Sequence, residues 1–172
     1  APLIGTGLGL TETGGFCTYT AIDDGVDDLA KGIGFASPLC PLTVRRPMLD
    51  DGSAGPLCEP GEVGEICFEG PQIFLGYLSD PAATASTVST DGICYTADLG
   101  TYDADGLHFS GRRKLVIKPK GYQVFPSDVE DHIQAILGGK IANVGVVGAD
   151  HAVFVEAIVA FVEPMDAGSL LA

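Results

Sequence analysis

Glycine and proline divide the apolar residues of this chain into short runs. The sequence has 24 glycines and 11 prolines among 172 residues, and 46% of its residues are hydrophobic. This composition is typical of a globular chain and not of a disordered one, and no run approaches the ~20 apolar residues of a membrane span. The length is sufficient for one medium domain or two small ones.

Strand and helix signals alternate along the chain and predict an α+β fold. Residues 63–70 alternate inward and outward side chains, as a half-buried strand does. Strands are also predicted on both sides of the turn DADG at 103–106, and over 141–149 and 157–164. A short helix is predicted to begin at Pro81, capped by Asp80 or Ser79, and another to begin within 126–128. The second has apolar residues at helical spacing, Val129, Ile133, Ile136 and Leu137.

The charge of the chain is strongly acidic but unevenly placed. The formal net charge is −14, which argues against a general nucleic-acid or anionic-membrane surface. Five of the nine basic residues nevertheless fall within nine positions: Arg112, Arg113, Lys114, Lys118 and Lys120. Any anion site is therefore expected to be local and to involve this stretch.

The five cysteines show neither C-x-x-C spacing nor a nearby histidine pattern. They are interpreted as reduced, partly buried thiols, which suits an intracellular, cytoplasmic protein and leaves a peroxisomal one open. No secretion signal is visible at the N-terminus.

Three stretches have residues suited to nucleotide chemistry. In GLGLTETGG, at 7–15, glycines allow a phosphate to approach the backbone, Thr11 offers a hydroxyl, and Glu12 offers a carboxylate of the kind that Mg²⁺ favours. The alternative is a glycine-rich turn with capping threonines. Asp98 follows a predicted strand and could accept hydrogen bonds from both hydroxyls of a ribose, with Arg112 nearby. The spacing alone favours the alternative, an ordinary carboxylate near a turn.

The third stretch is the basic one. Lys118 and Lys120 are predicted to lie on one face of a strand, and Gly121 permits an unusual backbone path or a close ligand approach. The alternative is a solvated hairpin of like charges.

These stretches, in this order, resemble the adenylate-forming superfamily of acyl- and aryl-CoA synthetases, peptide-synthetase adenylation domains and firefly-type luciferases. GLGLTETGG is similar to the family motif G-Y-G-x-T-E-T. Residues 61–84, GEVGEICFEGPQIFLGYLSDPAAT, are similar to G-E-[IL]-x-x-x-G-P-x-x-x-x-G-Y-x-x-[DN]-P-x-x-T. Residues 91–130 resemble the segment from D-G-W-x-x-T-G-D through G-R-x-K to K-x-K-G, and the K-x-K-G-Y-Q-V form favours the CoA-ligase and luciferase branch.

The resemblance implies a two-step reaction, in which a carboxylate and Mg·ATP give an acyl adenylate and a thiol then displaces AMP. It implies ATP, Mg²⁺ and coenzyme A as cofactors and a small carboxylic acid as substrate. The implied roles are α-phosphate contact for Thr11, Mg²⁺ binding for Glu12, nucleotide binding for Gly7, Leu8, Gly9, Asp98 and Arg112, an acyl-pocket border for Gly14 and Gly15, and thioester formation for Lys118, Lys120 and Gly121.

The implied organisation has three parts. Residues 1–112 would be the end of a large domain with a distorted β-barrel subdomain, 113–116 a hinge that includes Lys114, and 117–172 an incomplete C-terminal lid. The family's phosphate loop and C-terminal lysine would lie outside 1–172, so this piece alone is expected to be inactive, and the face left by the missing part is expected to favour self-association.

Three positions depart from the family pattern. Leu8 stands where a tyrosine usually stacks on adenine, and Ala97 stands where a glycine usually precedes the aspartate. Leu75 also replaces a frequent basic residue. Two other functions therefore stay open: an adenylation domain that loads a carrier protein, and a noncatalytic nucleotide- or acyl-binding relative.

Overall fold

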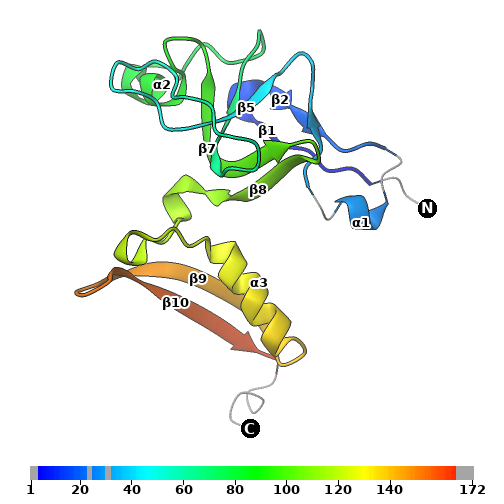
Figure 1. The fold of residues 1–172 in the computed structure, drawn as a ribbon, viewed down its shortest axis with the longest axis vertical. Helices are drawn as coiled ribbons and strands as arrows, with labels where there is room; N and C mark the ends of the chain where they lie inside the picture. Colours follow the sequence, from blue (N-terminus) through cyan, green and yellow to red (C-terminus); the bar gives the residue numbers. More distant parts are fainter. Residues whose placement is uncertain (1–3, 23–24, 30–31, 166–172) are drawn as a thin grey trace. The chain divides into compact units, whose positions relative to one another are not determined.

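The computed structural model describes residues 4–22, 25–29 and 32–165 (Figure 1). Backbone contacts divide the chain into two compact units, residues 1–110 and residues 111–172. The sequence predicted a boundary after Arg112 and a hinge over 113–116, and these assignments remain predictions.

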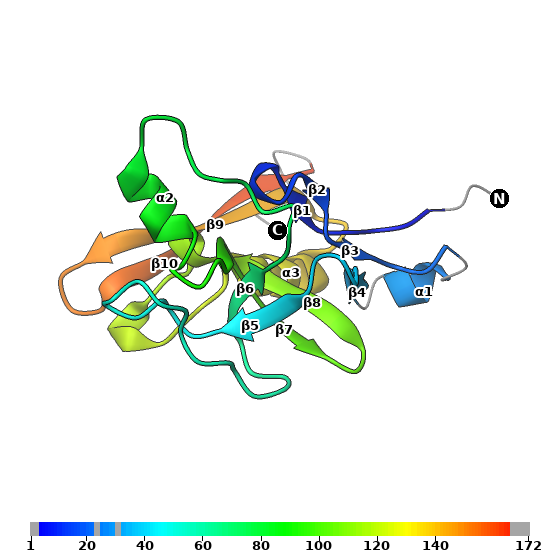
Figure 2. The same cartoon turned by 90° about the horizontal axis from the view of Figure 1, so that it is seen from above.

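Unit 1 consists mainly of short strands. Its elements in chain order are β1 (Gly9–Leu10), η1 (Thr11–Thr13), β2 (Gly15–Phe16), β3 (Thr18–Tyr19), α1 (Val26–Leu29), β4 (Phe35–Ala36), β5 (Leu42–Arg45), β6 (Gly64–Phe68), α2 (Pro81–Thr87), β7 (Cys94–Asp103) and β8 (Gly106–Arg112), whose last two residues fall in unit 2. Strands β5, β6, β7 and β8 form one sheet in that order, while β1 pairs with β2 and β3 with β4 (Figure 2). The predicted helix at Pro81 and the predicted hairpin at 103–106 are confirmed.

The described residues form no closed barrel, and the distorted β-barrel subdomain remains a prediction. A barrel requires the first and last strands of a sheet to pair. In the four-stranded sheet, β5 and β8 are the two edges and do not pair with each other. The fold is therefore a mixture of open sheets and short helices.

Strand β6 is buried on both faces, which corrects the prediction of a half-buried strand. Ile66 and Phe68 belong to a core cluster with Leu42 and Val44 of β5. On the other face, Cys67 packs with Ile93 and Tyr95. A strand that is covered on both faces can hold polar residues only where they are hydrogen-bonded. The alternation of apolar and polar residues in β6 therefore did not indicate that one face of the strand is exposed to solvent.

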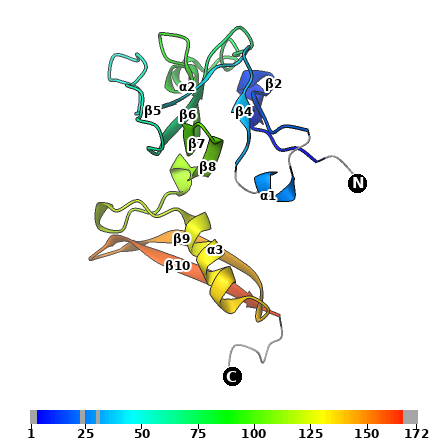
Figure 3. The same cartoon turned by 45° about the vertical axis from the view of Figure 1, so that its right-hand side comes forward.

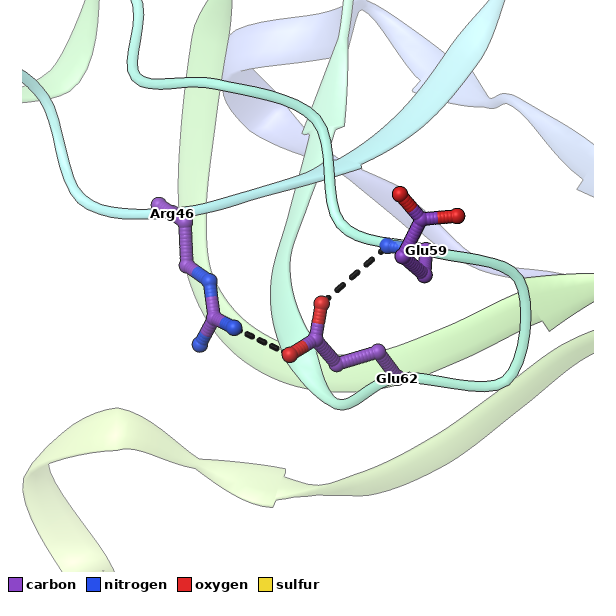
Figure 4. A network of polar contacts seen from close by, with 3 residues as sticks. All are labelled: Arg46, Glu59 and Glu62. Carbon is purple, nitrogen blue, oxygen red and sulfur yellow. Dashed lines mark hydrogen bonds and ion pairs between the residues drawn. The ribbon is translucent and has the colours of Figure 1, made fainter.

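An exposed ion pair closes the loop between β5 and β6 (Figure 4). Arg46 pairs with Glu62, whose other carboxylate oxygen accepts the backbone N–H of Glu59 at 3.1 Å. Because both charged side chains are substantially exposed, the pair contributes under about 1 kcal/mol. The network has a local structural role.

Unit 2 is a helix on a two-stranded hairpin. It contains η2 (Arg113–Leu115), η3 (Pro119–Gly121), α3 (Pro126–Leu137), β9 (Ile141–His151) and β10 (Val155–Pro164). Helix α3 lies along the β9–β10 hairpin (Figure 3). The predicted helix and both strands are confirmed, although Ile136, assigned to the apolar stripe, is 66% exposed.

Candidate functional site

The T-E-T segment is a single 3₁₀ turn that is fixed by its last residue. Thr13 is 2% exposed, its hydroxyl donates to the carbonyl oxygens of Leu10 and Gly15 at 3.0 and 2.8 Å, and it accepts the Leu10 N–H at 3.0 Å. Thr11 is exposed and Glu12 is half-buried. The buried threonine therefore holds a turn in which Thr11 is exposed to solvent.

The glycines on the two sides of this turn have different surroundings. A Cβ on Gly7 would lie 2.4 Å from the Thr18 carbonyl oxygen, and one on Gly9 would lie 2.3 Å from that of Gly15. These two glycines are explained by close backbone packing in the β1–β2 region. Gly14 and Gly15 are exposed, and no atom lies within 4 Å of a Cβ built on Gly15.

Leu8 is directed toward the protein interior. Its side chain is partly buried against the core cluster of unit 1. Its N–H donates to Thr18 Oγ1 at 2.8 Å, and its carbonyl accepts the N–H of Cys17 at 2.7 Å. The nucleotide contact predicted for Leu8 remains a prediction beside this packing role.

Asp98 lies at an irregularity of β7. Between the pairs Glu65↔Leu99 and Cys67↔Tyr95, β6 has one residue, Ile66, whereas β7 has three, residues 96–98. Such a bulge re-aims side chains relative to a regular strand. Asp98 is 2% exposed.

Two side chains satisfy the backbone of the bulge. Thr96 Oγ1 donates to the Ile66 carbonyl oxygen at 2.8 Å and accepts the Asp98 N–H at 3.1 Å. Ala97 has a left-handed φ of 62°, and its N–H donates to the buried Glu65 carboxylate at 2.9 Å. The backbone before Asp98 thus adopts the conformation that the family's glycine would favour, although alanine is present.

Glu12 and Asp98 lie on two different elements of unit 1, η1 and β7. Burial, and to a lesser degree the carboxylate of Glu12, raises the pKa of the Cys94 thiol to about 11. Cys94 is the first residue of the strand that contains Asp98. Glu12 therefore contributes to the electrostatic surroundings of the first residue of β7.

The remaining predicted residues belong to unit 2. Arg112 ends β8 and Lys114 lies in η2, and both side chains are exposed. Lys118 is the residue before η3, and Lys120 and Gly121 lie within it.

The prediction that Lys118 and Lys120 share one face of a strand is wrong. Pro119 fixes its own φ and has no N–H for a ladder, while Lys120 and Gly121 have φ values of 50° and 87°. The Lys120 N–H donates to the Phe154 carbonyl oxygen at 2.8 Å, and its ammonium lies 4.7 Å from the centre of the Phe154 ring. The basic segment is a tight turn anchored to the β9–β10 hairpin.

Three residues of this region were not singled out from the sequence: Thr13, Glu65 and Tyr77. The last donates its hydroxyl to Glu12 Oε1 at 2.5 Å. The sequence did offer a sign of two of them, because Thr13 lies at the spacing of a capping residue and Tyr77 lies in the G-Y motif. The strand pattern around Glu65 gave no indication that its carboxylate is buried.

No helix in the described part of the chain is long and apolar enough to cross a membrane. Within residues 4–22, 25–29 and 32–165, no three His, Cys, Asp or Glu side chains form a group suited to a metal ion.

Residues 2–78 match the AMP-binding enzyme family. The chain is 37% identical over 171 residues to 4-coumarate–CoA ligase 1 of Arabidopsis thaliana, an alignment that covers 92% of this chain and 28% of that protein. It is 32% identical over 161 residues to the long-chain-fatty-acid–CoA ligase of Salmonella typhimurium, covering 93% of this chain and 27% of that protein. The chain thus spans under a third of the length of these relatives.

Solved structures of related enzymes also match this chain. ATP-bound MatB from Rhodopseudomonas palustris matches with a TM-score of 0.80 and 31% identity, covering 92% of this chain and 30% of that one. The o-succinylbenzoate coenzyme A synthetase MenE of Bacillus subtilis, in complex with ATP and magnesium ion, matches with a TM-score of 0.76 and 27% identity, covering 97% and 33%. The chain belongs to the adenylate-forming superfamily of AMP-binding enzymes.

Proposed function

We propose that the chain is part of an ATP-dependent carboxylate–CoA ligase, which forms an acyl adenylate and then an acyl-CoA thioester. The observation that carries the proposal is the T-E-T turn, in which buried Thr13 fixes the backbone while Thr11 and Glu12 stay accessible. The similarity of nearly the whole chain to acid–CoA ligases supports this proposal.

The residues of unit 1 suit a magnesium nucleotide. Mg²⁺ is usually held by one or two carboxylates together with substrate phosphates and waters. Glu12 would supply one such carboxylate, Thr11 would donate its hydroxyl to the α-phosphate, and the buried Asp98 would accept from the ribose hydroxyls. The cation would neutralise charge that develops on the phosphate during attack by the carboxylate.

The turn in unit 2 suits the second half-reaction. Lys118 is exposed and Lys120 is held over an aromatic ring, so the turn that contains Gly121 has two cationic side chains within three positions of this glycine. We propose that these groups attract the phosphates of coenzyme A, and that Lys114 is the residue about which the lid turns between the two steps.

The bulge at Asp98 argues against a decayed nucleotide site. Ala97 departs from the family's glycine, yet Glu65 stabilises the same left-handed backbone. The alanine therefore does not disrupt the backbone conformation that precedes Asp98.

Acid-dependent exchange of pyrophosphate into ATP tests the first step in the full natural protein. Exchange is expected with a panel of aromatic and fatty acids and is expected to fall at least 100-fold in Glu12→Gln and Asp98→Ala. A protein that binds the nucleotide but exchanges with no acid would favour the noncatalytic alternative. Exchange followed by acylation of a carrier protein, and not of coenzyme A, would favour the carrier-loading alternative.

A further inference from the structure

Tyr77 joins the loop after β6 to the T-E-T turn through a side-chain hydrogen bond. Its hydroxyl donates to Glu12 Oε1 at 2.5 Å, across 65 residues of sequence. A second bond runs between the same segments, from the Phe74 N–H to the Glu12 carbonyl oxygen at 2.8 Å. Both the backbone and the carboxylate of Glu12 are therefore fixed by the segment 74–77.

Helix α2 holds Tyr77 in turn. The Tyr77 N–H donates to Thr84 Oγ1 at 2.9 Å, and Thr84 Oγ1 donates to the Asp80 carbonyl oxygen at 2.9 Å. Asp80 caps the helix by accepting the Ala83 N–H at 2.8 Å, and Pro81 occupies its first turn. No residue of this helix is fully buried, and the helix contacts β7.

Gly76 makes this arrangement sterically possible. A Cβ at Gly76 would lie 2.7 Å from the Thr84 side chain, and its φ of 142° disfavours other residues. The Tyr77 ring also meets the Phe74 ring edge-on at 4.8 Å between centroids. Residues 76–84, G-Y-L-S-D-P-A-A-T, thus form one local structure that orients the Tyr77 hydroxyl toward Glu12.

We propose that Tyr77 is a positioning residue, which orients the Glu12 carboxylate for a divalent cation bound with the nucleotide. The inference rests on the proposed function. Tyr77 uses one carboxylate oxygen, Oε1, and a carboxylate has a second oxygen that can coordinate a cation while the first is held.

The test is binding of Mn²⁺, followed by electron paramagnetic resonance, to the full natural protein with a non-hydrolysable ATP analogue. Removal of a partner that orients a metal ligand typically weakens metal binding 10- to 100-fold. Tyr77→Phe, which keeps the ring, is expected to weaken Mn²⁺ binding about tenfold. Tyr102→Phe is the matched control, because it also removes a hydrogen-bonded hydroxyl, one that accepts the Ala36 N–H at 3.3 Å in the same unit.

A double variant shows whether Tyr77 acts through Glu12. In a Glu12→Gln background, Tyr77→Phe is expected to have no further effect on Mn²⁺ affinity. Unchanged binding in the single Tyr77→Phe variant, or the same tenfold loss in both backgrounds, would overturn the inference. So would a Tm loss in Tyr77→Phe several degrees beyond that of Tyr102→Phe, because the effect would then be on the fold. A natural protein that binds neither Mn²⁺ nor the analogue would instead contradict the proposed function.

Discussion

Replacing Ala97 with glycine is expected to preserve or raise the stability of unit 1, although glycine normally destabilises a folded chain. Ala97 has a φ of 62° in the bulge before Asp98. A left-handed conformation costs an L-residue about 1–2 kcal/mol, and glycine avoids this cost. Glycine in turn makes the unfolded chain more flexible, which costs about 0.4–1 kcal/mol. The net change in the free energy of unfolding is therefore expected to lie between about zero and +1.5 kcal/mol.

Ala85→Gly supplies the matched control. Ala85 is exposed within α2 of the same unit and is absent from the residues with positive φ, so glycine there is expected to cost about 1 kcal/mol. The two variants make the same chemical change, and the difference of about 1–2.5 kcal/mol between their free energies of unfolding isolates the backbone conformation at position 97.

Urea unfolding measures this difference. The chain has no tryptophan, and four of its five tyrosines, at 19, 77, 95 and 102, lie in unit 1, so tyrosine fluorescence reports mainly on that unit. Ala97→Gly should keep or raise the unfolding midpoint at constant slope, while Ala85→Gly should lower it. An equal loss of stability in both variants would refute the left-handed assignment and the explanation of the bulge.

Three further predictions concern the buried carboxylate, the thiols and the basic turn. Glu65→Ala should lower the free energy of unfolding, measured in urea, by about 1–3 kcal/mol, because the Ala97 N–H loses its acceptor. Glu65→Gln keeps an acceptor oxygen and should lower it less, and equal losses would contradict this role. Burial raises the pKa of the Cys40 thiol from 9.0 to about 12 and that of the Cys94 thiol to about 11. The unfolded chain therefore releases these protons at a lower pH than the folded chain does, and the free energy of unfolding should fall as pH rises from 9 through 11. A Cys40→Ala, Cys94→Ala double variant should show a shallower fall in urea midpoints between pH 8 and 10.5, and an identical fall would assign it to other groups. Lys118→Ala should slow thioester formation about tenfold or more in the full natural protein while pyrophosphate exchange changes less than threefold, and equal losses in both half-reactions would rule out this division.

The regular elements of this fold could be predicted because their signals are local. Pro81 after Asp80 marks a helix start through capping and a fixed φ, and the turn at 103–106 marks a hairpin through its glycine. The helix beginning at Pro126 follows from its apolar spacing in the same way. These features depend on residues within a few positions of one another.

The geometry of the site could be predicted only in part because it depends on contacts between distant segments. Glu65 meets Ala97 across 32 residues, and Tyr77 meets Glu12 across 65. Lys120 was assigned to a strand because its neighbours alternate, but contact with Phe154 and a left-handed backbone place it in a turn. Spacing along a sequence does not contain this information.

Formation of an acyl-CoA thioester tests the central proposal most directly. The full natural protein would be incubated with Mg·ATP, coenzyme A and a panel of aromatic and fatty acids, and the products would be identified by mass spectrometry. A thioester is expected with at least one acid, dependent on ATP and reduced at least 100-fold in Asp98→Ala. ATP-dependent activation of an acid with no transfer to coenzyme A, or thioester formation unaffected by Asp98→Ala, would contradict this proposal.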